Sequence, residues 1–360
     1  MADKIRVVVL GASGYSGWEL VRLLERHPGV ELVATAANSE AGKTLQDLDP
    51  QARQHPLLSV EAALDLKFDA CFAALPHGVS QQVVAAVYDQ GRTVIDLSAD
   101  FRLNSPEVYE RHYGVPHGRP DLLNEAVYGL TEWNRQSLSR GRLVANPGCY
   151  PTCVLLPLGP WARRGWLAGA HIIADCKSGV SGAGRSAKIG SLYVEVNENL
   201  SPYQLGNVHR HTVEMEQELA DLGLGFELAR LTFSPHLVPL SRGMLGTLYV
   251  PWPDGVTESE LRHALEQDYH QEPFVRVLAA GQTASVAHTS RTNLCAISLH
   301  PVVERKILIL VSSIDNLLKG AAGQAVQNFN RVYGFPETTS LAPLVGSPGS
   351  PTRPPEGGTA

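Results

Sequence analysis

One cysteine near the middle of the chain stands where its thiol could act as a nucleophile. Cys149 lies in the run NPGCYPT at residues 146–152. The residues up to Gly148 are typical of a turn, and Pro151 suits the first turn of a helix because its fixed φ is already helical. A thiolate at a helix N-terminus is stabilised by the local amides, so we expect the pKa of Cys149 to lie below the ordinary ~8.5. The alternative is a buried cysteine that only begins a helix.

The other four cysteines are scattered along the chain and lack the paired spacing of a zinc site. They are Cys71, Cys153, Cys176 and Cys295. A disulfide between Cys149 and Cys153 would be unusual in a reducing cytoplasm. We therefore expect these four to be small, buried, apolar side chains.

A nucleophilic thiol needs a base, and residues 208–214 (VHRHTVE) supply candidates. His209 and His211 open an amphipathic helix, and an imidazole can accept a thiol proton and return it near neutral pH. Together with Glu214 the two histidines resemble metal ligands, but no further ligand follows at a recognisable spacing. The pattern favours a thiol and an imidazole acting together, without a metal.

A dinucleotide would need a glycine-rich turn between a strand and a helix, and the chain begins with that pattern. Residues 5–10 (IRVVVL) predict a central parallel strand, residues 11–17 (GASGYSG) the turn, and residues 18–24 a helix. Such glycines permit a tight turn and let the backbone approach a pyrophosphate at the helix N-terminus. The alternative is a purely structural turn, since the glycine spacing is not that of the usual fingerprint.

The choice between NAD and NADP depends on the residues after the second strand, which we place at residues 31–36. A carboxylate there would bind the ribose 2′-hydroxyl and repel a 2′-phosphate. Asn38 and Ser39 follow instead, then Lys43, and Glu40 is the nearest carboxylate. Small polar donors without a carboxylate favour NADP.

Further buried strands at residues 68–75 and 94–98 alternate with helical segments. This alternation predicts a Rossmann-type, doubly wound parallel sheet whose ligands bind at the carboxyl ends of the strands. His77 and Arg102 fall at those ends. His77 could contact the cofactor, or cap a helix or be solvated. Arg102 could bind an anion, or form a structural ion pair with Asp100 or Asp96.

The pattern changes after Cys149. A strand at residues 171–176 enters the loop 177–185, whose small residues between two cations suit an anion or a planar ring. Later strands with short connections predict an α+β domain with a mixed or antiparallel sheet. These strands are at residues 230–233, 244–250, 293–299 and 306–311. A helix rich in small residues from about residue 315 is expected to return to the first domain beside the nicotinamide.

Composition limits the partners. Apolar residues make up 44% and charged residues 18% of the 360 residues, which is typical of a folded protein of two domains. A net charge of −6 argues against a nucleic-acid-binding surface. We find no leader pattern and no apolar run near the ~20 residues that span a bilayer. We expect a cytoplasmic protein with a small-molecule partner, without nucleic acid or membrane.

A dinucleotide site, an activated cysteine and a histidine together define one reaction class. The thiolate attacks an acyl carbon, a thioester forms, and a hydride passes between that carbon and the nicotinamide. In the reducing direction an acyl phosphate is the natural donor, and Arg102 or Arg185 could hold its phosphate. Two alternative functions belong to other classes of protein. One is a nucleotide-sensing protein with an inert cysteine, and the other is a cysteine hydrolase.

Four segments also resemble one enzyme family, the N-acetyl-gamma-glutamyl-phosphate reductases of arginine biosynthesis. They are residues 11–17, 146–152, 209–214 and 315–324. The resemblance spans about residues 4–337 and implies NADPH-dependent reduction of N-acetyl-L-glutamyl 5-phosphate to the 5-semialdehyde with release of phosphate. It implies Cys149 as the nucleophile, His211 as the acid/base, and cofactor contacts from Asn316 and the glycine-rich turn. Two departures are Thr131, where the family more often has proline, and the tail.

The related reductase of lysine biosynthesis, which acts on a carrier-bound aminoadipyl phosphate, and aspartate-semialdehyde dehydrogenase are the alternatives within the superfamily. The lysine-biosynthesis enzyme resembles the first half but lacks the PGCYPT run. We expect an NADP-binding domain at residues 1–148 completed by a helix at 316–335, a catalytic and dimerisation domain at 149–315, and a mobile tail at 340–360. A homodimer or homotetramer is expected.

The expected site has two groups of residues besides Cys149 and His211. The substrate-binding group is Arg102, Asn146, Ser178, Arg185 and His209. The cofactor-binding group is Gly11, Ser13, Gly14, Tyr15, Ser16, Gly17, Asn38, Ser39, Pro76, His77, Gly182, Asn316 and Gly320.

Overall fold

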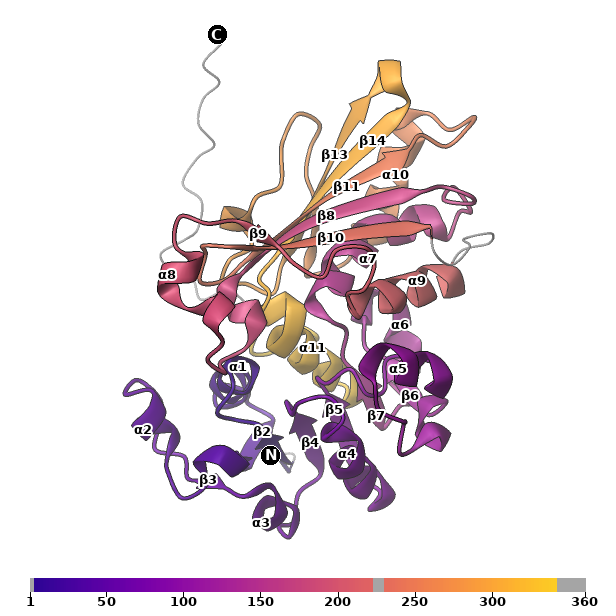
Figure 1. Ribbon diagram of the computed structural model, residues 1–360. Helices are drawn as coiled ribbons and strands as arrows, with labels where there is room; N and C mark the ends of the chain where they lie inside the picture. The colour runs from indigo at the N-terminus through magenta and orange to yellow at the C-terminus, as the bar shows by residue number, and fades with distance from the viewer. Residues whose placement is uncertain (1–2, 223–229, 342–360) are drawn as a thin grey trace.

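The computed structural model describes residues 3–222 and 230–341, which form two seven-stranded sheets with helices between and around them (Figure 1). The first sheet has the order β3-β2-β1-β4-β5-β7-β6, and all its pairings are parallel. Its strands are β1 Ile5–Leu10, β2 Val30–Ala36, β3 Leu57–Leu58, β4 Ala70–Ala73, β5 Thr93–Asp96, β6 Ala126–Tyr128 and β7 Leu143–Ala145.

Helices cover both faces of this sheet. Side chains of β1 alternate, so Val7 and Val9 share one core with α1 (Tyr15–Leu24) and α11 (Gly323–Val332). Val8 and Leu10 face the opposite core, which includes α3 (Val60–Leu64) and α4 (Ser80–Asp89). Branched apolar residues buried on both sides are what a central parallel strand requires. The predicted doubly wound parallel sheet is confirmed.

The second sheet is mixed, with the order β12-β13-β14-β11-β8-β10-β9. The pairs β8/β10 and β12/β13 are parallel and the other pairs are antiparallel. Its strands are β8 Ile172–Gly179, β9 Ser201–Pro202, β10 Leu231–Val238, β11 Met244–Pro251, β12 Val275–Val277, β13 Cys295–Val302 and β14 Ile307–Ile314. This sheet confirms the predicted α+β second part.

One face of the second sheet packs on three helices, α7 (Cys149–Ala162), α9 (His211–Leu222) and α10 (Glu258–Tyr269), which form a single core with the strands. The opposite face carries Ile173 and Tyr249, which are 42% and 39% exposed. Shorter helices lie elsewhere in the chain, namely α2 Leu45–Leu48, α5 Pro106–Tyr113, α6 Thr131–Leu138 and α8 Tyr193–Val196.

The last segment returns from the second sheet to the first. After β14 the chain makes a π-helical turn at Leu318–Ala322 and continues as α11, which lies between the two sheets in Figure 1. The helix expected over residues 316–335 therefore begins with a π turn. Ser340 donates a hydrogen bond to the Leu23 carbonyl and Leu341 is buried against the first domain. The rest of the tail expected to be mobile lies outside the described residues.

A buried ion pair fixes this returning segment. Lys319 and Glu132 are fully buried, and their charged atoms lie 2.6 Å apart. Gln327 of α11 accepts a hydrogen bond from Lys319 and donates one to Glu132. Because two ions in a low-dielectric core must be paired and hydrogen-bonded, this cluster ties the π turn and α11 to α6.

Replacing Lys319 by Met should lower the free energy of unfolding by ~3–5 kcal/mol, because the buried Glu132 carboxylate would lose its counter-ion. Urea denaturation followed by circular dichroism measures the change. The double variant Lys319→Met with Glu132→Gln should recover part of the loss.

The control is Arg119→Met, which removes a largely exposed pair with Asp89 and should leave the unfolding midpoint nearly unchanged. An equal shift of the midpoint in Lys319→Met and Arg119→Met would contradict the role given to the buried pair.

Candidate active site

The turn that carries Cys149 lies at the carboxyl end of the first sheet. Strand β7 ends at Ala145, the Asn146 backbone N–H donates to the Asp96 carbonyl at 2.8 Å, and α7 begins at Cys149 itself. Gly148 is the N-cap, with extended φ and ψ and no side-chain cap. The predicted helix start is confirmed.

Two glycines let three segments meet at this cysteine. A Cβ placed on Gly148 would lie 2.6 Å from Nε2 of His211 and 3.0 Å from a guanidinium nitrogen of Arg102. A Cβ placed on Gly320 would lie 2.7 Å from Cβ of Cys149. Real Cβ atoms do not approach other atoms to 2.6 or 2.7 Å, so a side chain at either glycine would displace His211 or Cys149.

Glu214 holds the site together from α9. Its carboxylate is 1% exposed and accepts hydrogen bonds from the backbone N–H of Gly148 and the hydroxyl of Tyr128, both at 2.9 Å. Its other oxygen pairs with Arg102 at 3.2 Å. Glu214 therefore fixes the cysteine turn, Arg102 and the helix of His211 relative to one another.

Arg102 forms an ion pair, but not with either of the two aspartates considered as alternatives. Asp96 binds Ser80 and Ser98, and Asp100 binds the amides of Gly78 and Gln81, so neither reaches Arg102. Arg102 instead contacts Glu214 and the Leu97 carbonyl, and its buried Nε has no hydrogen-bond partner among the described residues. The ion pair considered as the alternative for Arg102 is therefore present, but its partner is Glu214, which lies 112 positions away in the chain.

The rings of His209 and His211 lie next to each other beside the turn, tilted by 58°. Their ring centroids are 4.8 Å apart, and the His211 backbone N–H donates to Nδ1 of His209 at 3.1 Å. Tyr150, the residue after Cys149, packs edge-on against both rings. Burial, with the nearby charges of Arg102 and Arg210, holds the pKa of His211 well below its usual range. His211 is therefore neutral at physiological pH and able to accept a proton.

The pKa of the Cys149 thiol is raised, contrary to the sequence-based expectation. Burial raises it to about 11, and this outweighs the lowering by the Tyr150 amide and by the charge of Arg102. The amides at the helix start lower the pKa of Cys149, as expected, but by less than burial raises it. The prediction of a lowered pKa was therefore wrong for this structure, and the thiol needs a neighbouring base. The other four cysteines are buried, as expected.

A cavity of about 380 Å³ joins the glycine-rich turn to the cysteine turn. It brings together eight residues expected to bind the cofactor, with Cys149, His211 and Asn146. The eight are Gly14, Tyr15, Ser16, Gly17, Pro76, Gly182, Asn316 and Gly320. A Cβ on Gly17 would lie 2.2 Å from the Gly11 carbonyl oxygen, and Gly11 has φ +81°. The turn therefore requires its glycines and leaves the N-terminus of α1 open, which fits a pyrophosphate.

Three side chains that were expected to bind ligands form hydrogen bonds to other groups of the protein. The Asn146 amide donates to the Ala321 carbonyl and accepts from Asn328. Asn316 accepts from the Gly243 amide and donates to Ser181, and buried Ser178 donates to the Gly179 carbonyl. These side chains position the loops around the cavity.

The remaining expected cofactor residues lie outside this cavity. Asn38 accepts a hydrogen bond from the Val60 amide, and Ser39 is exposed beside it. The Ser13 carbonyl accepts from Arg185, whose guanidinium lies 4.8 Å from the Trp18 ring centroid. Arg185, expected at the substrate, lies against the glycine-rich turn and lines the same cavity as Cys149.

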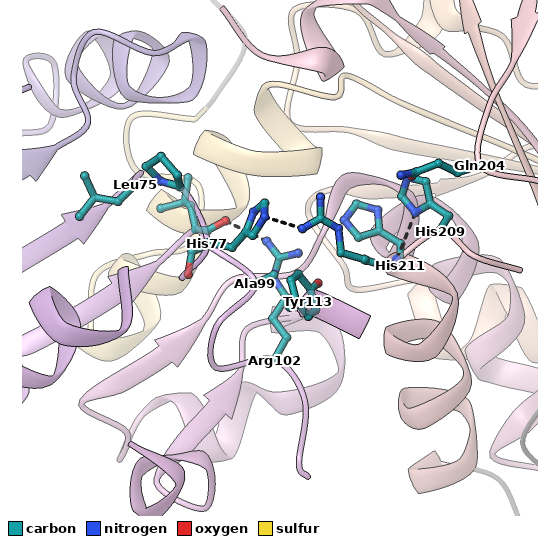
Figure 2. Close-up of a pocket in the computed structure, with 12 residues that line it drawn as sticks. Leu75, His77, Ala99, Arg102, Tyr113, Gln204, His209 and His211 are labelled. Atoms are coloured by element: carbon teal, nitrogen blue, oxygen red, sulfur yellow. Dashed lines mark hydrogen bonds between the residues drawn. The ribbon is translucent and has the colours of Figure 1, made fainter. Parts of the chain in front are cut away.

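A second cavity of about 310 Å³ adjoins the first (Figure 2). His77, expected at the cofactor, and His209 line it, and Arg102 and His211 line both cavities. Tyr128 was not predicted as part of the site, and Glu214 was considered only as a metal ligand. The placement of Glu214 three residues after His211 on one helix face was the available signal.

Alkylation of Cys149 by iodoacetamide should become faster with pH up to about pH 9 without a plateau, because only the thiolate reacts and the pKa lies near 11. Mass spectrometry of peptides, with Cys149→Ser as the control for other thiols, measures the rate. A plateau near pH 6 would contradict the raised pKa.

Comparisons with known proteins agree with this architecture. Residues 6–140 match the family described as semialdehyde dehydrogenase, NAD binding domain, and residues 149–316 match the semialdehyde dehydrogenase dimerisation domain. Among solved structures, aspartate semialdehyde dehydrogenase II of Vibrio cholerae superposes with a TM-score of 0.69 at 17% identity, covering 92% of this chain and 99% of that chain. This likeness concerns the fold.

Curated relatives are closer in sequence. The N-acetyl-gamma-glutamyl-phosphate reductase of Pelobacter propionicus is 47% identical, with 94% of this chain and 99% of the relative covered. That of Neisseria meningitidis serogroup A is 43% identical, with 96% and 99% covered. The chain is an oxidoreductase that belongs to the N-acetyl-gamma-glutamyl-phosphate reductase family, as the sequence motifs indicated.

Proposed function

We propose that the protein reduces N-acetyl-L-glutamyl 5-phosphate with NADPH to the 5-semialdehyde and phosphate, through a thioester on Cys149. The observation that carries this proposal is that Cys149 and His211 line the same cavity as the glycine-rich turn. A nucleophile, a neutral imidazole and a cofactor site thus share one space. The names of the relatives supply the substrate.

In this proposal His211, which is neutral in the empty site, accepts the thiol proton as the sulfur attacks. The Cys149 sulfur attacks the acyl carbon, the bond from that carbon to the phosphate oxygen breaks, and phosphate leaves. The hydride for the thioester carbon would come from a nicotinamide bound in this cavity. The carbon–sulfur bond then breaks to release the aldehyde, and the proton on His211 returns to the sulfur.

Arg102 is the proposed holder of the leaving phosphate. Its guanidinium lies beside the Gly148 turn, and its buried Nε has no partner among the described residues. A buried donor of this kind is costly unless it binds something, and a phosphate oxygen is a suitable acceptor. Glu214 keeps the guanidinium in place through the 3.2 Å ion pair.

NADP rather than NAD is proposed from the charges near the end of β2. Glu40 is the carboxylate that could repel a 2′-phosphate, but it is bound to Lys43 at 2.8 Å. The hydrogen bond from Lys43 and, more weakly, the charge of Arg185 lower the pKa of Glu40. Two cations therefore surround one carboxylate, and this region, with Ser39 exposed, suits a phosphate.

The protein is proposed to form a homodimer and to be located in the cytoplasm. The second sheet leaves one face with exposed apolar residues, and this region matches the dimerisation domain of the family. A second copy would cover that face. Five free thiols suit a reducing compartment. No helix among residues 3–222 and 230–341 is apolar and long enough to span a bilayer.

The loss of NADPH absorbance should occur with N-acetylglutamyl phosphate and be at least ~10-fold slower with aminoadipyl or aspartyl phosphate. Cys149→Ser should abolish turnover while retaining NADPH binding, which controls for folding. No turnover with any acyl phosphate, or activity of Cys149→Ser near that of the wild type, would refute the proposal.

Arg185→Gln should raise the KM for NADPH by ~10-fold or more and change the KM for NADH little, since only NADPH carries the 2′-phosphate. Steady-state kinetics with both cofactors measure the difference. Arg305→Gln removes an exposed arginine at the β13–β14 turn and serves as the control. If Arg185→Gln changes the KM for NADPH and the KM for NADH equally, Arg185 does not bind the 2′-phosphate.

A further inference from the structure

The second cavity is lined by basic side chains. Twelve residues line it, and they include two arginines and three histidines but no carboxylate (Figure 2). The arginines are Arg102 and Arg210, and the histidines are His77, His209 and His211. A cavity lined in this way favours a ligand with negative charge.

Arg210 carries the uncompensated charge of this cavity. Arg102 is neutralised by Glu214, whereas Arg210 forms no ion pair with any carboxylate of the described residues. Its guanidinium carbon lies 5.0 Å from the Tyr113 ring centroid, and it contacts Nε2 of His77, as the dashed line from His77 in Figure 2 marks. The aromatic ring and the imidazole hold the guanidinium without neutralising it.

The charge of Arg210 acts on the surrounding imidazoles. Burial lowers the pKa of His77 and of His209, the latter to about 4, and the charge of Arg210 adds to both shifts. It also lowers the pKa of His211. Three neutral imidazoles around a free guanidinium leave this cation as the main electrostatic feature of the cavity.

The two cavities are continuous at the reacting group. Arg102 and His211 line both cavities, whereas Cys149 lines only the cofactor cavity and Arg210 only the second. An acyl phosphate bound at Cys149 has its phosphate one atom from the acyl carbon, beside Arg102. The rest of the substrate can therefore extend past Arg102 and His211 toward Arg210.

We propose that Arg210 binds a carboxylate at the end of the substrate remote from the acyl phosphate, and so selects acyl phosphates that are also acids. This inference rests on the proposed function and deepens it. A guanidinium offers paired N–H donors that match a carboxylate. His77 and Tyr113, from the first domain, position Arg210, which belongs to the segment leading into α9. Selection therefore depends on both halves of the chain.

The test compares two aldehydes in the oxidising direction, with NADP and inorganic phosphate as co-substrates. One is N-acetylglutamate 5-semialdehyde and the other is the same compound with its 1-carboxylate converted to an amide. The wild type should favour the acid by about 10- to 100-fold in kcat/KM, the scale of lost hydrogen bonds to a charged group. Arg210→Gln should bring this ratio close to one, mainly through the KM of the acid.

Controls separate this role from general effects. Arg210→Gln should bind NADPH with the affinity of the wild type, which shows that it is folded, and Arg210→Lys should keep part of the ratio. Lys188→Gln removes an exposed cation whose charge also reaches His77, and it should keep the full ratio.

Three outcomes would overturn the assignment. If Arg210→Gln keeps the preference for the acid, or the wild type has none, Arg210 does not read the carboxylate. If the variant slows both aldehydes equally and raises the KM for phosphate, Arg210 holds the phosphate instead. If the wild type oxidises neither aldehyde, the proposed function fails and the assignment of Arg210 fails with it.

Discussion

The geometry of the site depends on the absence of side chains at two glycines that touch the cysteine turn. Gly148 lies against His211 and Arg102, and Gly320 lies against Cys149. One contact comes from α9 and the other from the segment that returns after β14. Any Cβ at these positions would push the nucleophile away from its base or from the cofactor side. The close approach of these backbones therefore determines where the sulfur, the imidazole and the guanidinium lie.

Close approach brings burial, and burial sets the electrostatics. It raises the pKa of the Cys149 thiol and lowers that of His211, so both groups are neutral before substrate binds. The proton of the Cys149 thiol can then pass to His211 only as the sulfur attacks the substrate. Glu214 compensates Arg102 within this buried region, while Arg210 is left without a carboxylate at the far end. The reacting centre is thus balanced in charge and the outer cavity is not, which suits a substrate with a second negative group.

Local sequence patterns predicted the elements well, because the strand β1, the glycine-rich turn and the start of α7 are encoded by neighbouring residues. They failed where the outcome depends on partners far away in the chain. The pairing of Arg102 with Glu214, for example, joins residues 112 positions apart in the chain. The pKa of Cys149 depends on how deeply the completed fold buries the thiol, and a helix-start pattern carries no information about depth. The role of Arg210 could not be predicted for the same reason, because His77 and Tyr113 contact it only in the folded chain.

Intact-protein mass spectrometry of the enzyme mixed with N-acetylglutamyl phosphate, without NADPH, tests the central claim most directly. The account predicts one N-acetylglutamyl group per chain, located on Cys149 by peptide mapping and lost when NADPH is added. Phosphate should be released in equal amount. A protein that releases no phosphate and gains no mass, or that carries the acyl group on another residue, would contradict the assignment of Cys149 as the nucleophile.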